Sequence, residues 1–414
     1  MNIKHLQKSF YACGAALLLG ACLASSETAT VRNKAQSNTT SIDASVVPVQ
    51  RTTTRSSSSA SESLRNGVNI TAPTTPQNTI SASSPSVLSS AANATSLPNY
   101  LAERPDVQAF IREMVVKHGF TSSALFTVFS RAQIQPEIIA LITRPAEAKP
   151  WYAYRQIFLT PERVQKGVEF WRTHEKALAR AEQRYGVPAE IIVAIIGVET
   201  FYGRNVGRHQ VLEALSTLAF AYPKRADFFR KELENYLLLT REEGIDPLAL
   251  QGSYAGAMGL GQFMPSSYRA YAVDFNNDGY RDIWNNPEDA IGSVANYLSE
   301  HHWQRSELIT VPARVSGDHY TALISAKPEK PFHTIRTLQQ RGVHAPKTLN
   351  EHQKAILLQL EGNDGPKYWL GFYNFYVITR YNRSPLYAMA VYQLSQDIHD
   401  LKRQFRTALY LPQS

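Results

Sequence analysis

The feature that most constrains the fold is an apolar run that ends in a single carboxylate, Glu199. Every residue from Ile191 to Val198 is apolar or glycine. A helix that is apolar on all sides is normally buried inside a protein. The run therefore predicts a central helix, surrounded by other elements, with one acidic side chain at its end.

A buried carboxyl without a partner cation stays protonated near neutral pH, because removing its charge from water is costly. A retained proton is what a general acid needs in order to protonate a leaving oxygen. The alternative is a structural Glu199 paired with an arginine, since ion pairs also perturb carboxylates. Both interpretations are open at this point.

The chain has 414 residues and a net charge of +8, which as a prior indicates two or three domains and a basic surface. A basic surface suits a polyanionic partner such as nucleic acid, acidic glycan or anionic lipid. No Lys/Arg block favours nucleic acid, because the basic residues are scattered among acidic ones. We therefore expect no nucleic-acid partner.

The N-terminus predicts export. Lys4 and Lys8 precede a short apolar stretch, which is typical of a secretory signal over residues 1–21. The ending Leu19-Gly20-Ala21-Cys22 resembles the bacterial lipoprotein cleavage box, which implies lipidation of Cys22. Cys22 is followed by Leu23 and not by Asp, which resembles lipoproteins that are sorted to the outer membrane. We therefore expect a periplasmic protein with a lipid anchor in the outer membrane. An ordinary cleaved signal is the alternative.

Composition divides the remainder of the chain. Residues 22–97 are rich in Ser and Thr and predict a disordered tether. Residues 98–307 predict helices, among them 106–118, 160–185, 188–203, 226–243 and 286–302. Residues 308–348 predict a small β-containing subdomain. Residues 349–414 predict C-terminal helices at 351–361 and 384–404.

A second informative segment runs from Gln251 to Pro265 and holds four glycines. Small residues let a backbone approach another object closely. Ser253 and Gln262 are the polar side chains that could meet that object. The segment lacks the Gly-Lys-Ser/Thr ending of a phosphate loop. A tight helix crossing is the alternative interpretation.

Together these segments resemble a known family. The runs Ile196–Gly203, Gly252–Gly259, Phe263–Tyr268, Ala290–Tyr297 and Phe375–Asn382 are similar to those of the membrane-bound lytic murein transglycosylase B family. The resemblance covers roughly residues 101–404. It implies a mainly α protein with a goose-type lysozyme-like α+β catalytic core, a helical N-terminal domain and a small β-containing subdomain.

The resemblance also implies the reaction. Such enzymes cleave the β-1,4 bond between N-acetylmuramic acid and N-acetylglucosamine in peptidoglycan, with Glu199 as the one acid/base. The muramoyl C6 hydroxyl attacks C1 and closes a 1,6-anhydro ring, so no second carboxylate is needed. Ser253, Gln262, Tyr154, Tyr297, Tyr381 and Asn382 are implied to bind substrate. We expect a monomer, with enzymes of cell-wall synthesis as candidate partners.

Residues 274–280 match the first half of an EF-hand loop. Asp274, Asn276 and Asp278 offer side-chain oxygens, and Tyr280 offers its backbone carbonyl. The twelfth position is Asn285 where a glutamate is usual. The resemblance implies a longer loop closed by Asp289, with Glu288 as the alternative, and a structural Ca²⁺. A surface turn without metal is the other interpretation.

Two rival functions remain at the level of sequence. The first is a muramidase that uses water, and the second is a non-catalytic peptidoglycan-binding lipoprotein. Neither a His-Glu-x-x-His pattern nor a Gly-x-Ser-x-Gly elbow is present in the sequence. We expect no organic cofactor.

Overall fold

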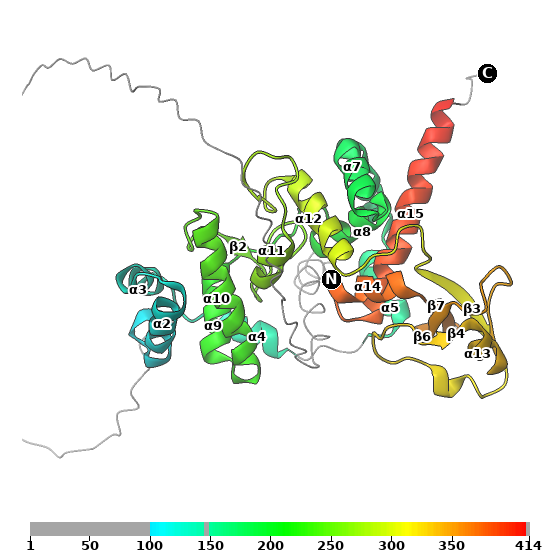
Figure 1. Cartoon of the computed structure of the whole chain (residues 1–414), viewed down its shortest axis with the longest axis horizontal. Helices are drawn as coiled ribbons and strands as arrows, with labels where there is room; N and C mark the ends of the chain where they lie inside the picture. Colours follow the sequence, from blue (N-terminus) through cyan, green and yellow to red (C-terminus); the bar gives the residue numbers. More distant parts are fainter. Residues whose placement is uncertain (1–99, 145–148, 411–414) are drawn as a thin grey trace, which may run out of the picture. The chain divides into compact units, whose positions relative to one another are not determined.

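The computed structural model describes residues 100–144 and 149–410, with side chains to Phe405. The predicted signal sequence, Cys22 and the predicted tether lie outside the described residues. Helices dominate, as predicted (Figure 1). The first of them are η2 (Leu101–Glu103), α2 (Pro105–His118), α3 (Ser122–Ser130), α4 (Pro136–Thr143), α5 (Trp151–Phe158), α6 (Pro161–Thr173), α7 (Glu175–Tyr185) and α8 (Ala189–Thr200).

The later helices follow the glycine and proline signals of the sequence. They are α9 (Val211–Ala221), η3 (Pro223–Arg225), α10 (Ala226–Glu242), α11 (Pro265–Tyr271), α12 (Pro287–Glu300), η4 (Thr321–Leu323), α13 (Ile335–Gln340), α14 (Tyr373–Tyr381) and α15 (Pro385–Tyr410). Predicted helices 106–118, 226–243, 286–302 and 384–404 are confirmed to within a few residues at most ends.

Helix α8 is central, as its apolar run predicts. Its side chains from Ile191 to Val198 are buried, and α15, α6, α7 and α12 pack around it. This burial is possible only because no polar side chain interrupts the run before Glu199. The helix ends at Thr200, one residue after the carboxylate.

One predicted helix, 160–185, is two helices. The hydroxyl of Thr160 accepts a hydrogen bond from the Arg163 amide and caps α6 as predicted. The helix then breaks at His174 (φ −112°, ψ 26°), and α7 continues to Gly186. Apolar periodicity continues across this break, which is why the sequence did not reveal it.

A second prediction, the helix at residues 351–361, is wrong. Residues Lys354–Gly362 form strand β6, which pairs antiparallel with β7 (Gly365–Gly371). A short apolar run fits a helix or a strand equally well by periodicity. The overlooked signal is Asn363-Asp364, a two-residue hairpin loop between the paired Gly362 and Gly365, with Gly365 at φ +108°.

The sheet has five strands in the order β4-β6-β7-β3-β5, all antiparallel. The other members are β3 (Thr310–Val315), β4 (His333–Thr334) and β5 (Val343–His344). It has its own small core, made by Ile335, Leu338, Val343, Ala355, Leu357, Leu370 and Phe372. The β-containing subdomain therefore continues to Gly371, beyond the predicted boundary at residue 348.

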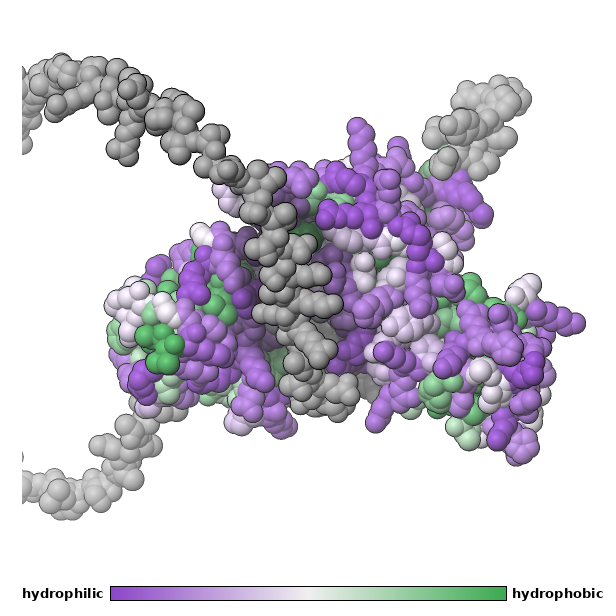
Figure 2. All heavy atoms as spheres, in the orientation of Figure 1, coloured by the Kyte–Doolittle hydropathy of each residue, from purple (hydrophilic) through white to green (hydrophobic). Residues whose placement is uncertain are grey.

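Hydrophilic side chains cover most of the visible face of the described residues (Figure 2). Hydrophobic side chains gather there over α2 and α3, which carry the exposed Val116 and Phe126. Among residues 100–144 and 149–410, every helix is too short or too polar to span a lipid bilayer.

Candidate active site

Glu199 lies in the last turn of α8 and is half-buried. Its Oε1 accepts a hydrogen bond of 2.6 Å from the Tyr387 hydroxyl. Burial raises the pKa of Glu199 to about 8, and the Tyr387 hydrogen bond partly opposes that rise by stabilising the charged form. The carboxyl is therefore mainly protonated at neutral pH.

The structural alternative for Glu199 required a partner arginine. Within the described residues, none of the arginine ion pairs involves Glu199. No other carboxylate in this part of the chain lies near enough to shift its pKa. Glu199 is therefore an isolated acid whose proton is held by the surroundings.

Three tyrosines surround this carboxyl. Burial raises the pKa of Tyr154, Tyr381 and Tyr387, and the nearby Glu199 raises each of them further. Tyr154 comes from α5, Tyr381 from the end of α14 and Tyr387 from the first turn of α15. The structure thus brings together two predicted residues, Tyr154 and Tyr381, with Glu199.

Tyr387 was missed by the sequence analysis. It lies two residues after Pro385, which begins α15, and no local pattern marks it. Its contact with Glu199 exists because α15 packs along α8. The start signal Ser384-Pro385 could have shown that residue 387 lies in a first helical turn, but not which neighbour it meets.

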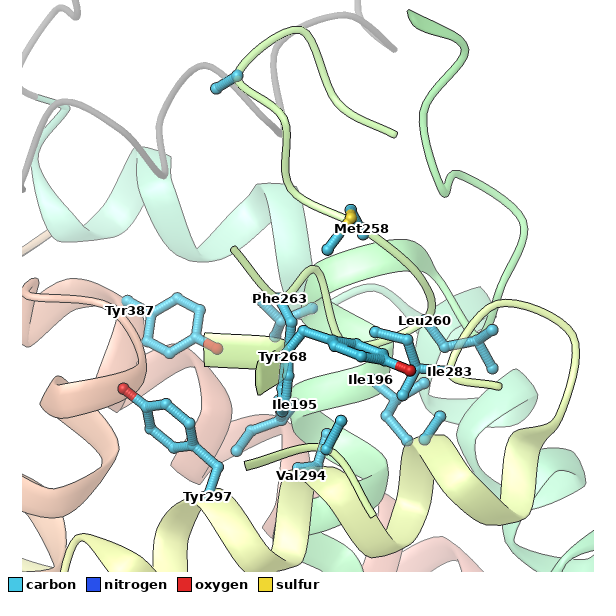
Figure 3. Packing of buried hydrophobic residues seen from close by; sticks show 14 of the residues in the cluster. Ile195, Ile196, Met258, Leu260, Phe263, Tyr268, Ile283, Val294, Tyr297 and Tyr387 are labelled. Carbon is cyan, nitrogen blue, oxygen red and sulfur yellow. The ribbon is translucent and has the colours of Figure 1, made fainter. Parts of the chain in front are cut away.

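Tyr297 and Asn382 are neighbours of Tyr381, the first in space and the second in sequence. The Tyr297 hydroxyl donates to the Arg380 carbonyl at 2.6 Å, and its ring packs edge-on against Tyr381 at 4.8 Å between centroids. Tyr297 rises from α12 beside Phe263 (Figure 3), with ring centroids 5.9 Å apart. Asn382 is 8% exposed and directly follows α14. Tyr297 thus supports Tyr381 from behind.

The segment from residue 251 to 265 is a loop and not a helix crossing. It begins at strand β2 (Gln251–Gly252), which pairs with β1 (His209–Gln210), and isolated bridges join Gly252 to Met258 and Met258 to Phe263. A Cβ atom at Gly207 would lie 2.0 Å from the Gly252 carbonyl oxygen. The close backbone approach predicted for this segment is therefore present.

Both predicted polar side chains of this loop are fixed by backbone contacts. Ser253 Oγ accepts hydrogen bonds from the amides of Ala255 (3.3 Å) and Ala257 (3.0 Å), which leaves its hydroxyl hydrogen to be donated. Gln262, at φ +52°, donates from Nε2 to the carbonyls of Val206 (3.1 Å) and Gly259 (3.0 Å). Its Oε1 remains as an acceptor.

Thr200 connects the loop to helix α8. Its buried Oγ1 lies 2.9 Å from the Leu260 carbonyl and accepts a hydrogen bond from the Gly203 amide at 3.0 Å. Tyr381 also donates to the loop, at the Gly261 carbonyl (2.6 Å). The loop and Glu199 are therefore held in one arrangement.

The predicted metal loop is tightly turned. The Asp274 carboxylate accepts hydrogen bonds from the amides of Asp278 (3.1 Å) and Gly279 (2.8 Å), and Gly279 has φ +95°. Asp289 is fully buried and faces the loop, because it accepts from the amides of Phe275 (2.8 Å) and Asp282 (2.9 Å).

Glu288, the alternative ligand, forms an ion pair with Arg180 at 2.8 Å. Among the described residues, no group of three His, Cys, Asp or Glu side chains is gathered closely enough to hold a metal ion by itself. A cation here would need amide and backbone oxygens as well.

Comparison with known proteins identifies the family. The transglycosylase SLT domain family matches residues 102–396 of the chain. The chain belongs to this family. This transglycosylase is 46% identical to membrane-bound lytic murein transglycosylase B of Escherichia coli (strain K12) over 316 residues, which cover 74% of this chain and 86% of that protein.

Solved structures agree. Soluble lytic transglycosylase SltB1 from Pseudomonas aeruginosa is similar with a TM-score of 0.70 and 50% identity, over 72% of this chain and 99% of that one. Lytic transglycosylase Slt35 of Escherichia coli in complex with calcium is similar with a TM-score of 0.68 and 45% identity, over 76% of this chain and 99% of that one. SltB3 from Pseudomonas aeruginosa in complex with NAG-anhNAM-pentapeptide is similar with a TM-score of 0.64 and 30% identity, over 71% of this chain and 79% of that one. The predicted family, the lysozyme-like fold and the transglycosylase activity are confirmed.

Proposed function

We propose that this transglycosylase cleaves the β-1,4 bond between N-acetylmuramic acid and N-acetylglucosamine in peptidoglycan, with Glu199 as its single acid/base. The observation that carries this proposal is the isolated, half-buried carboxyl with a pKa of about 8. At neutral pH it holds the proton that the leaving oxygen requires.

The reaction needs two proton transfers at the same group. Glu199 gives its proton to the glycosidic oxygen, and the bond from that oxygen to the muramoyl C1 breaks. The Glu199 carboxylate then takes the proton of the muramoyl C6 hydroxyl, whose oxygen bonds to C1. The 1,6-anhydro ring closes, Glu199 is protonated again, and no water is consumed.

Hydrolysis would need a second carboxylate. Inverting glycosidases place two carboxyl groups about 6.5–9.5 Å apart and retaining ones about 5–5.5 Å apart. Within the described residues, no second carboxylate is among the groups that shift the pKa of Glu199. An attacking hydroxyl already on the substrate removes that need, because it is held close to C1.

The surrounding residues have distinct proposed roles. Tyr387 stabilises the carboxylate that forms after the first proton transfer. The Ser253 hydroxyl and Gln262 Oε1 bind polar groups of the sugar next to the cleaved bond. Tyr154 and Tyr381 line the cleft around Glu199. Tyr297 and Asn382 support Tyr381 and the end of α14.

The test compares Glu199→Gln with Glu190→Gln on purified sacculi. Both residues lie on α8, and burial raises the pKa of Glu190 as well. We expect Glu199→Gln to lose turnover and still bind glycan, and Glu190→Gln to remain active. Products formed in ¹⁸O water should be unlabelled anhydro-muropeptides. Labelled reducing ends, or an active Glu199→Gln enzyme, would overturn the proposal.

We also propose that the loop from Asp274 to Asp289 holds a structural Ca²⁺. Its oxygen donors, namely the side chains of Asp274, Asn276, Asp278 and Asp289 and the Tyr280 carbonyl, suit a hard cation. The cation would hold the loop to the start of α12. We expect EDTA to lower the melting temperature of the wild type but not of Asp278→Ala. An unchanged wild-type melting curve would exclude the metal.

A third proposal concerns location. The lipoprotein-like box at Cys22 and the membrane-bound Escherichia coli relative support a periplasmic enzyme anchored by lipid to the outer membrane. Replacement of residues 1–22 by an ordinary cleaved secretory signal should move the protein from the outer-membrane fraction to the soluble periplasmic fraction. The proposal fails if the protein with the replaced signal stays with the membrane.

A further inference from the structure

Arg163 is a partly buried cation that forms no ion pair within the described residues, where the neighbouring Glu162 pairs with Arg204 instead. Its side chain donates from Nη1 to the Ile157 carbonyl, and its Nε is buried without a hydrogen-bond partner. Removing an unpaired charge from water is costly. Such a residue needs a reason beyond packing.

The guanidinium of Arg163 lies between two rings. Its centre is 5.3 Å from the Phe158 ring and 4.7 Å from the Phe201 ring. Phe158 is the last residue of α5, and its ring lies 5.2 Å from Tyr154. Phe201 is two residues after Glu199. The cation therefore connects the helix that carries Tyr154 with the turn that follows the catalytic acid.

That turn is strained. Phe201 (φ +53°) and Tyr202 (φ +60°) are both in the left-handed region, which costs free energy for residues with a side chain. Both residues directly follow α8, so the contacts that hold them in place also act on the last helical turn, which carries Glu199.

Arg163 contacts both strained residues. Its guanidinium covers Phe201, and its carbonyl oxygen accepts a hydrogen bond of 3.0 Å from the Tyr202 hydroxyl. That hydroxyl lies between α6 and α8, where a Cβ at Gly167 or Gly197 would come within 2.6 or 2.5 Å of it. The two glycines leave the space that the Tyr202 ring needs.

We propose that Arg163 is a positioning residue that holds the 201–202 turn against the end of α5, and so keeps Glu199 and Tyr154 in their catalytic relation. The proposal rests on the proposed acid/base role of Glu199. Arg163 would affect the chemical step through these contacts and not through substrate.

Arg204 provides a matched control. It also lies over Phe201, at 5.6 Å, but it is exposed and forms an ion pair with Glu162 at 3.1 Å. An exposed pair of this kind contributes little. Arg163→Gln and Arg204→Gln remove the same charge from the same ring, and only the first releases the turn from α5.

The experiment measures kcat and KM for anhydro-muropeptide release by Arg163→Gln, Arg163→Lys, Arg204→Gln and Tyr202→Phe, with circular dichroism to establish folding. We expect kcat of Arg163→Gln to fall about a hundredfold with KM little changed, since small misplacements cost that much. Arg163→Lys should recover part of the loss, and Tyr202→Phe should lose roughly tenfold. Arg204→Gln should match the wild type.

The outcomes separate the two proposals. An active Glu199→Gln enzyme would remove the acid/base assignment. An inactive Glu199→Gln enzyme beside a folded Arg163→Gln enzyme with wild-type kcat would remove only the positioning role. If Arg163→Gln does not fold, wild-type kcat in folded Tyr202→Phe and Arg163→Lys enzymes overturns the proposal, and the expected losses support it.

Discussion

Removal of the Tyr387 hydroxyl is the most direct test of how the site controls its acid. In Tyr387→Phe the ring remains and the 2.6 Å hydrogen bond to Glu199 is lost. Hydrogen bonds to charged groups contribute about 1.5–3 kcal/mol. At 1.36 kcal/mol for each pKa unit, the pKa of Glu199 should rise by about one to two units.

The sign follows from which form the hydroxyl stabilises. Tyr387 donates to the carboxylate, so its loss disfavours the charged form and raises the pKa above about 8. The alkaline limb of kcat/KM reports the pKa of the acid in the free enzyme. That limb should therefore move to higher pH.

The same hydrogen bond should also matter for rate. In the proposed mechanism, negative charge develops on Glu199 as it protonates the leaving oxygen, and the Tyr387 hydroxyl stabilises that charge. A loss of about 1.5–3 kcal/mol corresponds to a fall of roughly 10- to 100-fold in kcat at neutral pH.

The assay is initial release of anhydro-muropeptides from purified sacculi between about pH 5 and 10. Tyr392→Phe is the control, because Tyr392 is a half-buried tyrosine on the same helix. A folded Tyr387→Phe enzyme with an unmoved alkaline limb would refute the reasoning, as would an equal shift in Tyr392→Phe.

Three further predictions concern stability. Folding raises the pKa of Glu199 from 4.5 to about 8, so wild-type stability falls as pH rises across that range. In urea melts at pH 8–9, Glu199→Gln should be more stable than the wild type by at most about 5 kcal/mol. Near pH 4 the two proteins should be almost equally stable. Glu232→Ala should cost about 1–3 kcal/mol, because the Ser266 amide and hydroxyl lose their buried acceptor. Gly197→Ala should lower both the melting temperature and kcat, because its Cβ would lie 2.5 Å from the Tyr202 hydroxyl oxygen.

Local patterns predicted the parts of the fold that depend on local physics. The apolar run before Glu199 predicts burial because a fully apolar helix has few other stable environments. The cap at Thr160 and the stop at Gly186 follow from backbone chemistry alone. Strand β6 was mistaken for a helix because its buried residues, Ala355 to Leu358, form a continuous run without a period.

The site was predictable only in part. Glu199, Ser253 and Gln262 stand in distinctive sequence segments, so the sequence alone was enough to propose them. Tyr387 is 188 residues from Glu199 in sequence, and its contact depends on the rotation of α15 against α8. No property of residues 384–390 reports that rotation. Arg163 was missed for the same reason, since its two aromatic partners come from separate segments, the end of α5 and the turn after α8.

In the proposed mechanism, the environment of Glu199 explains how one carboxylate serves both halves of the reaction. A carboxyl with an ordinary pKa of 4.5 would be ionised at neutral pH and could not supply the first proton. With a pKa of about 8 it keeps that proton. After donating it, the same group is a stronger base than an ordinary carboxylate for the C6 hydroxyl. Burial on α8 raises the pKa and the Tyr387 hydroxyl limits the rise, so the balance between these two contacts determines how well Glu199 works in each direction.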